Sequence, residues 1–226
     1  MNNIEVYVIV EGQTEQTFIR EILAPLMSYK GIYLHPAIIG KPGHKGGDIR
    51  FERAKSDIGK LLKQRFNIYV STMFDYFRIE PDWPGRKNIQ SSDTALQKAK
   101  KLEQETLLSM IQEYPDQNVE KRFIPYVSMH EFEALLFSDT DKLAKIINTD
   151  PSKIENILKE CGEPEEINDN EQTAPSKRLQ SLCYKKYRKV AMGKIIANAI
   201  GINTIRKKCP HFNEWLNKLV LLEDQF

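Results

Sequence analysis

Residues 4–15 read IEVYVIVEGQTE, and this stretch decides the class of fold. Its first seven residues are mostly β-branched or aromatic. The run is too short for a core helix and ends at Glu11-Gly12, so it predicts a buried strand. Residues 14–29 then place apolar side chains at intervals of four, which predicts a helix. The chain therefore starts as a strand followed by a helix.

The same alternation continues along the chain. Further short apolar runs predict strands at residues 32–39, 68–74 and 122–129. Helices are expected at residues 49–66, 93–114, 130–137, 140–148, 151–161, 175–183, 185–200 and 210–222. Asp93 is the predicted N-cap of the longest helix. Strands that alternate with helices predict a parallel sheet covered by helices on both faces. We therefore expect an α/β domain at residues 1–139 and a helical C-terminal extension, residues 140–226, packed on it.

The composition is that of a soluble globular protein. Lys and Arg number 33 and Asp and Glu number 31 in 226 residues, with 41% hydrophobic and 28% charged residues, which excludes disorder and a collagen-like fibre. The three cysteines include no CxxC pair, so neither a thiolate zinc site nor a disulfide framework is expected. The sequence shows no signal-peptide pattern and no apolar run long enough to span a membrane. We expect a cytoplasmic protein with no membrane partner.

The charge is unevenly distributed along the chain. Residues 176–208 hold ten basic residues and no acid, whereas residues 163–171 hold five acids and no base. A segment of one sign is either a footprint for a polyanion or a solvated helix face. The glycine-rich loop at residues 40–47 is either a phosphate contact or a connector. If the polyanion is a nucleic acid, we expect contacts at Lys41, Lys45, Arg178, Lys185, Lys186, Arg188 and Lys189.

Acidic residues follow three of the four predicted strands. Glu11 and Glu15 follow the first strand, Asp75 the third, and Glu131 and Glu133 the fourth. Since the carboxyl ends of parallel strands meet at one edge, we expect these side chains to lie together. Clustered carboxylates repel each other unless a cation lies among them, and oxygen ligands favour Mg²⁺ or Mn²⁺. Two such ions would serve displacement at phosphorus, whereas acids acting singly would serve only as helix caps.

Five motifs resemble the DUF4276 family. They are VEGQTE at residues 10–15, TMFDYF at 72–77, SMHEFEALLFSD at 128–139, APSKRL at 174–179 and CPHF at 209–212. The resemblance runs in order through almost the whole chain. It implies a Toprim-like fold, similar to the Toprim part of OLD-type nucleases. It also implies a bacterial protein of phage defence or a mobile-element system, often with an AAA or ABC-type ATPase partner.

The resemblance also implies roles for particular residues. The first strand is followed by an EGxxE motif, and the fourth by two acids with one residue between them. A later DxD motif is incomplete, because Phe77 stands where the second acid would be. The implied metal ligands are Glu11, Glu15, Asp75, Glu131 and Glu133, and the implied catalytic residues are Glu11, Asp75, Glu133 and Lys177. In this scheme Lys177 offsets the negative charge of the transition state.

We therefore expect a nuclease that cleaves phosphodiester bonds in DNA or RNA with Mg²⁺ or Mn²⁺. Two alternatives stay open. One is a non-catalytic, Toprim-like partner subunit of an ATPase, which Phe77 favours. The other is a phosphotransferase or phosphatase that uses the same metals on a small phosphorylated molecule.

Overall fold

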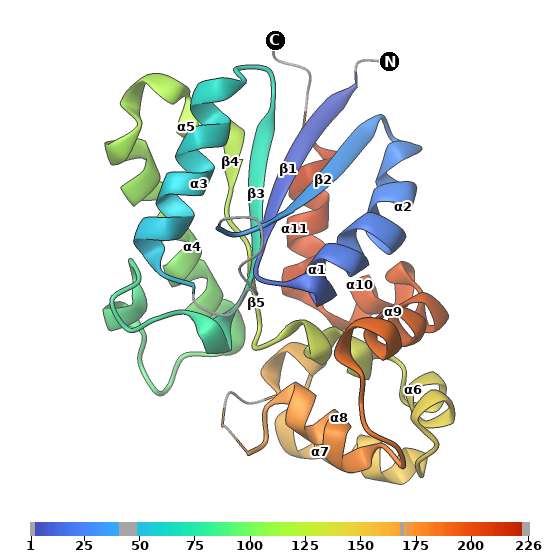
Figure 1. Ribbon diagram of the computed structural model, residues 1–226. Helices are drawn as coiled ribbons and strands as arrows, with labels where there is room; N and C mark the ends of the chain where they lie inside the picture. The colour runs from blue at the N-terminus through green and yellow to red at the C-terminus, as the bar shows by residue number, and fades with distance from the viewer. Residues whose placement is uncertain (1–2, 41–48, 168–169, 171, 223–226) are drawn as a thin grey trace.

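A five-stranded parallel sheet forms the centre of the molecule (Figure 1). The computed structural model describes residues 3–40, 49–167, 170 and 172–222. The strands are β1 (Ile4–Val10), β2 (Ile32–Ile38), β3 (Tyr69–Asp75), β4 (Phe123–Ile124) and β5 (Val127–Ser128). Their order is β2-β1-β3-β4, with β5 also paired to β3, and every pair is parallel. The prediction of a parallel α/β fold is confirmed.

The fourth predicted strand, residues 122–129, is interrupted in its middle. Pro125 has no backbone N–H to offer to the ladder. The side chain of Thr72 bridges the interruption, because its Oγ1 donates to Tyr126 O at 3.0 Å and accepts from Tyr126 N at 2.9 Å. The strand is therefore split into β4 and β5, and the prediction of one continuous strand was wrong.

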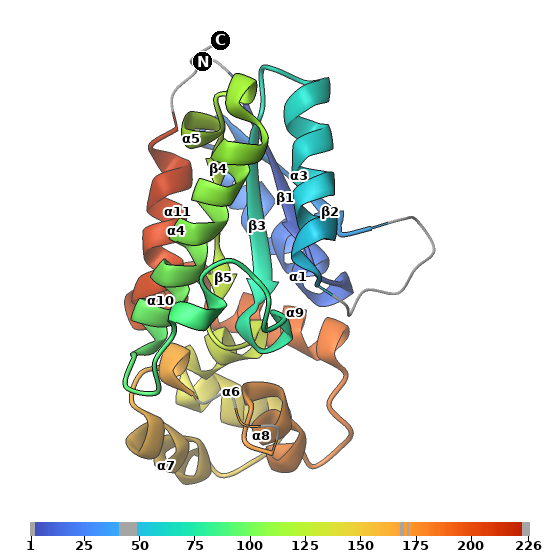
Figure 2. The same cartoon turned by 90° about the vertical axis from the view of Figure 1, so that its left-hand side faces the viewer.

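Helices cover both faces of the sheet (Figures 1 and 2). On one face lie α3 (Phe51–Gln64), α4 (Ala95–Glu113) and α5 (Val119–Arg122). On the other lie α1 (Gln13–Phe18), the π-helical turn η1 (Ile19–Leu23), α2 (Ala24–Ser28) and α11 (Pro210–Val220). Val8 of β1 packs into the α1–α2 core, whereas the next residue, Ile9, packs into the α3–α4 core. Successive side chains of the strand thus pack into two separate apolar layers, one on each face of the sheet.

The remaining helices come from the C-terminal part of the chain. They are η5 (Phe132–Ser138), α6 (Thr140–Ile147), α7 (Pro151–Cys161), η6 (Pro164–Glu166), α8 (Pro175–Leu182), α9 (Lys189–Ile200) and α10 (Ile202–Lys208). Three short 3-10 turns, η2 (Tyr76–Arg78), η3 (Arg86–Asn88) and η4 (Pro115–Gln117), complete the described elements. Helices α6–α9 lie beyond the carboxyl ends of the strands (Figure 2). That position puts them over the edge where strand-end side chains gather.

Some predicted helix boundaries were wrong. Helix α4 is capped by Thr94, whose Oγ1 accepts from Gln97 N, while Asp93 accepts from Gln90 N and pairs with Lys101. Helix α9 begins at Lys189 instead of residue 185, so residues 183–188 form a connection. Residues 132–138 form a 3-10 helix, and α10 was not predicted.

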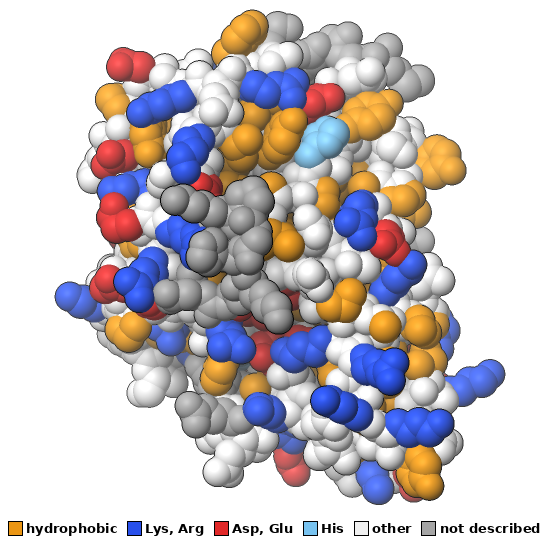
Figure 3. Space-filling view, in the orientation of Figure 1, with side chains coloured by type: hydrophobic (Ala, Val, Ile, Leu, Met, Phe, Trp, Pro, Cys, Tyr) orange, Lys and Arg blue, Asp and Glu red, His pale blue; other side chains and the backbone are white. Residues whose placement is uncertain are grey.

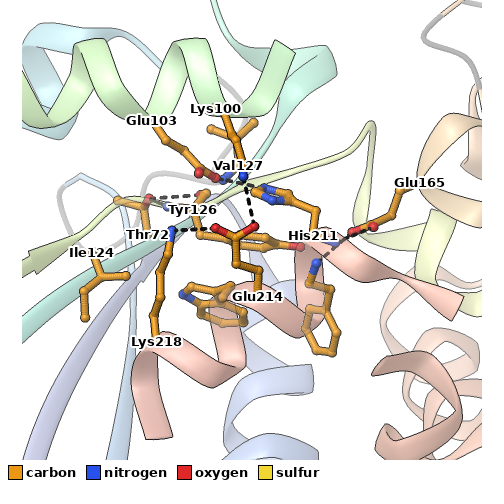
Figure 4. Close-up of polar contacts among 12 residues, drawn as sticks. Thr72, Lys100, Glu103, Ile124, Tyr126, Val127, Glu165, His211, Glu214 and Lys218 are labelled. Carbon is orange, nitrogen blue, oxygen red and sulfur yellow. Dashed lines mark hydrogen bonds and ion pairs between the residues drawn. The ribbon is translucent and has the colours of Figure 1, made fainter. Parts of the chain in front are cut away.

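Buried polar contacts join α11 to the sheet and to α4 (Figure 4). Glu103 Oε1 accepts from Val127 N at 2.9 Å and lies 2.9 Å from His211 Nε2. Glu165 caps the start of α11, since its two oxygens accept from the backbone N–H groups of His211 and Phe212. The C-terminal helices therefore share their core with the first half of the chain, while the predicted division at residue 139 stays a prediction. Within the described ranges, no helix has the length and apolar character needed to cross a membrane.

Candidate functional site

Three buried acids meet at the carboxyl edge of the sheet. Asp75 is the last residue of β3, Glu131 follows β5, and Glu133 lies in η5. One carboxylate oxygen from each lies within 4.8 Å of the other two. The three residues are only 7%, 4% and 1% exposed. Buried like charges at this separation are costly without a cation, so these three side chains could hold a metal ion.

Two more acids face this cluster from the end of β1. Glu15, in the first turn of α1, accepts a hydrogen bond from Gly12 N at 3.0 Å. Glu11 Oε1 lies 3.7 Å from Arg78 Nε. Its other oxygen, Oε2, is buried and accepts no hydrogen bond from any described residue. A buried carboxylate oxygen without a hydrogen-bond partner could serve as a further metal ligand.

The pKa values report the same crowding of negative charge. Burial raises the pKa of Asp75 well above its ordinary value, and the charges of Glu15 and Glu11 raise it further. Burial also raises the pKa of Glu11 to about 7, with a second contribution from Glu15. Burial raises the pKa of Glu133 to about 7, although the charge of Lys189 acts in the opposite direction. These three carboxyl groups therefore retain part of their protons near neutral pH until a cation compensates their charge.

Backbone groups hold two of the acids in place. Asp75 Oδ1 accepts from Phe132 N at 2.9 Å, which ties β3 to η5. Glu131 accepts from both Ser176 N at 2.8 Å and Ser176 Oγ at 3.1 Å, at the start of α8. The role of Ser176 at this site was not predicted from the sequence. Its position after Pro175, where a helix begins with free N–H groups, is the signal that would have found it.

Comparison with known protein families identifies the family of the chain. A family model described as "Domain of unknown function (DUF4276)" matches residues 10–220. The chain belongs to the DUF4276 family. No curated protein and no solved structure matches the chain. All five acids of the site lie within the matched part of the DUF4276 chain.

A lysine lies against the acids of this DUF4276 chain. Lys189, at the start of α9, holds its Nζ 3.4 Å from Glu133 Oε1 and 3.9 Å from Glu131 Oε1. Sequence analysis predicted Lys189 only as a nucleic-acid contact. Lys177, the predicted catalytic lysine, is exposed and lines the same cavity of about 220 Å³ as Lys189 and Phe77. Its role stays a prediction.

The other predicted phosphate contacts differ in their surroundings. Arg178 is held inside α7–α8, since its Nε donates to Thr173 O at 2.9 Å and its Nη1 lies 3.7 Å from Glu160. Three predicted phosphate contacts, Lys185, Lys186 and Arg188, are exposed and lie in the connection between α8 and α9. Lys41 and Lys45 lie outside the described residues. Figure 3 shows Lys and Arg side chains gathered over the lower half of this face, around a small acidic area.

Proposed function

We propose that this DUF4276 protein is a divalent-metal-dependent nuclease that hydrolyses phosphodiester bonds in DNA or RNA. The observation that carries the proposal is the convergence of Asp75, Glu131 and Glu133, with ligand oxygens within 4.8 Å of one another. The donor set consists of oxygen atoms alone, which suits Mg²⁺ or Mn²⁺ better than zinc or copper. The orphaned Oε2 of Glu11 fits the same group.

Bound Mg²⁺ or Mn²⁺ would supply an activated water and would neutralise charge on the leaving oxygen. Residues of the chain would hold this ion in place. Asp75, Glu131 and Glu133 would hold the cation, and Glu11 and Glu15 would complete the acidic site. Asp75 and Glu131 are preorganised for this task by their bonds to Phe132 N and Ser176.

Cationic groups border the acids on two sides. Arg78 lies 3.7 Å from Glu11, and Lys189 lies 3.4 Å from Glu133. Both residues line the cavity of about 220 Å³ beside the acids, as does Lys177. They would attract a phosphate group that the carboxylates alone would repel, and they would offset negative charge that develops in the transition state.

The resemblance to Toprim sites of OLD-type nucleases supports this proposal. The EGxxE motif supplies Glu11 and Glu15, and Asp75 and the Glu131–Glu133 pair complete the acidic set. On the same ground we assign the protein to bacterial phage defence or a mobile-element system, with an AAA or ABC-type ATPase as a partner. These assignments extend the proposal.

A second candidate is a non-catalytic partner subunit of such an ATPase. Two observations favour it. Phe77 replaces the second acid of the DxD motif. In addition, Lys189 already compensates part of the charge on Glu131 and Glu133. In that case the acids would stabilise the docking of α9 onto the sheet and would need no metal.

A cleavage assay separates the candidates. The full chain is incubated with single-stranded DNA, duplex DNA and RNA in Mn²⁺, Mg²⁺ or EDTA. We expect cleavage that requires the divalent ion and is lost in Asp75→Asn, while Glu155→Gln, an exposed change on α7, retains it. The absence of both cleavage and Mn²⁺ binding, the latter measured by calorimetry, would favour the non-catalytic candidate. Activity on p-nitrophenyl phosphate but not on its bis-ester would instead identify a phosphatase.

A further inference from the structure

The connection between α8 and α9 forms a wall shared by two neighbouring cavities. Tyr187 and Lys189 line the cavity of about 220 Å³ that also contains Glu131. Tyr184 and Arg188 line a second cavity of about 450 Å³. Because these residues belong to one short segment, a chain-like ligand that crosses residues 183–189 passes from the second cavity to the acids.

The second cavity has the charge that a polyanion requires. Lys185, Lys186 and Arg188 line it, and none of the described residues that line it carries a carboxylate. All three side chains are exposed, and none forms an ion pair with a described residue. By contrast, Lys194 of the same basic segment is paired with Glu21. Lys185, Lys186 and Arg188 are therefore available to bind an anion at this cavity.

An exposed aromatic ring lies among these cations. Tyr184 is 80% exposed, although its backbone N–H is held by Ile147 O at 3.5 Å. Bases of a single strand stack on rings presented in this way while nearby cations bind the phosphates. Bases within a duplex are already stacked and paired, so their faces cannot reach such a ring.

We propose that residues 183–189 form the entry path for a single-stranded polynucleotide. Lys185, Lys186 and Arg188 bind its phosphates, one base stacks on Tyr184, and the strand continues past Tyr187 to the acids. The inference deepens the proposed function and rests on it, since it names the class of substrate that the same site accepts.

Fluorescence anisotropy in EDTA tests the path without cleavage. The probes are an oligothymidylate, an abasic strand of equal length and a duplex. We expect Tyr184→Ala to weaken binding of the oligothymidylate by about fivefold or more, from the lost stacking. Tyr184→Phe keeps the ring and should bind like the wild type. Tyr29→Ala removes a ring that is 87% exposed but lies in neither cavity, and it should have no effect.

The probes without accessible bases give the contrast. Tyr184→Ala should leave binding of the abasic strand and of the duplex unchanged. An equal loss on all three probes, or a loss in Tyr184→Phe as large as in Tyr184→Ala, would overturn base stacking on Tyr184.

A salt titration tests the phosphate contacts. We expect the paired change Lys185→Gln with Lys186→Gln to flatten the slope of log affinity against log salt by about 1.4, or about 0.7 per lost contact to a single strand. The same change at Lys207 and Lys208, exposed on α10 and outside both cavities, is the matched control. Equal slopes for the two pairs would overturn the path.

The binding and cleavage experiments test the entry path and the nuclease proposal independently. If the wild type cleaves but Tyr184→Ala binds every probe unchanged, the path is wrong and the nuclease proposal stands. If binding depends on Tyr184 but no cleavage occurs with any metal, the nuclease proposal is wrong and the path stands. A wild type that binds none of the probes would overturn the path.

Discussion

Lys189 holds its ammonium nitrogen 3.4 Å from Oε1 of Glu133, across the junction between α9 and the carboxyl edge of the sheet. Burial on its own lowers the pKa of Lys189, but the charges of Glu133 and Glu131 outweigh it and raise that pKa. The lysine therefore remains charged and compensates part of the acidic cluster. A metal ion bound by the acids would share them with this ammonium group.

Metal binding should stabilise the protein through these acids. At a Mn²⁺ concentration about 100 times the dissociation constant, we expect the melting temperature to rise by about 5–10 °C. The rise should be lost in Glu133→Gln and Asp75→Asn and retained in Glu155→Gln, measured by scanning calorimetry. A full rise in both site variants would place the ion elsewhere.

Removal of an acid should also change the stability of the metal-free protein. Removal of one acid from a mutually repelling set should raise the melting temperature in EDTA, because the remaining carboxylates repel each other less. Glu11→Ala should behave in this way and should also abolish divalent-dependent activity. A melting temperature in EDTA that falls in Glu11→Ala would show that Glu11 stabilises the fold by itself.

The stability of the metal-free protein should decrease as pH rises. The pKa of Glu133 is raised from an ordinary value of 4.5 to about 7, by burial first, against the opposing charge of Lys189. Between these two pH values the folded state binds more protons than the unfolded state, so the free energy of unfolding falls with pH. Urea titrations in EDTA across this window should show the decline.

The matched variants identify the group responsible for that decline. Glu133→Gln cannot titrate, so its free energy of unfolding should depend less on pH than that of the wild type. Glu155→Gln should decline as the wild type does, because Glu155 is exposed. Parallel declines in Glu133→Gln and the wild type would assign the pH dependence to other groups.

Two lysines can be compared for the role of offsetting transition-state charge. Lys189→Gln should lower the cleavage rate by about 10²-fold, as for the loss of one preorganised charge-stabilising group. It should also strengthen Mn²⁺ binding, because the acids lose a competing cation. Lys177→Gln, at an exposed position on the same cavity, should reduce the rate less. Single-turnover assays give both rates, and a larger loss in Lys177→Gln would assign the role to Lys177.

The buried contact between Glu103 and His211 should contribute strongly to folding stability. Glu103→Ala leaves His211 Nε2 and Val127 N without their shared acceptor, so we expect a loss of about 3–5 kcal/mol in the free energy of unfolding. Glu103→Gln retains an acceptor oxygen and should lose clearly less. Urea denaturation measures both, and equal losses would show that charge rather than hydrogen bonding holds this contact.

Local sequence patterns located β1, β2 and β3 closely, but not the split between β4 and β5. The short apolar runs of β1 and β3, each followed directly by an acid, predicted where Glu11 and Asp75 lie. The interruption at Pro125 was missed because apolar periodicity alone does not register a missing N–H donor. The late start of α9 was also missed, since residues 185–188 (KKYR) carry no signal that distinguishes a helix from a connection.

The sequence by itself determined the parallel α/β fold and the edge at which the acids gather, because apolar runs and strand-end positions are local properties. Only the tertiary structure decided which groups face those acids. Ser176 reaches Glu131 across 45 residues of sequence, and Lys189 reaches Glu133 from the start of another helix. Such partners are chosen by the packing of α8 and α9 over the sheet edge, where burial makes each unpaired charge costly. No local spacing in the chain encodes that choice.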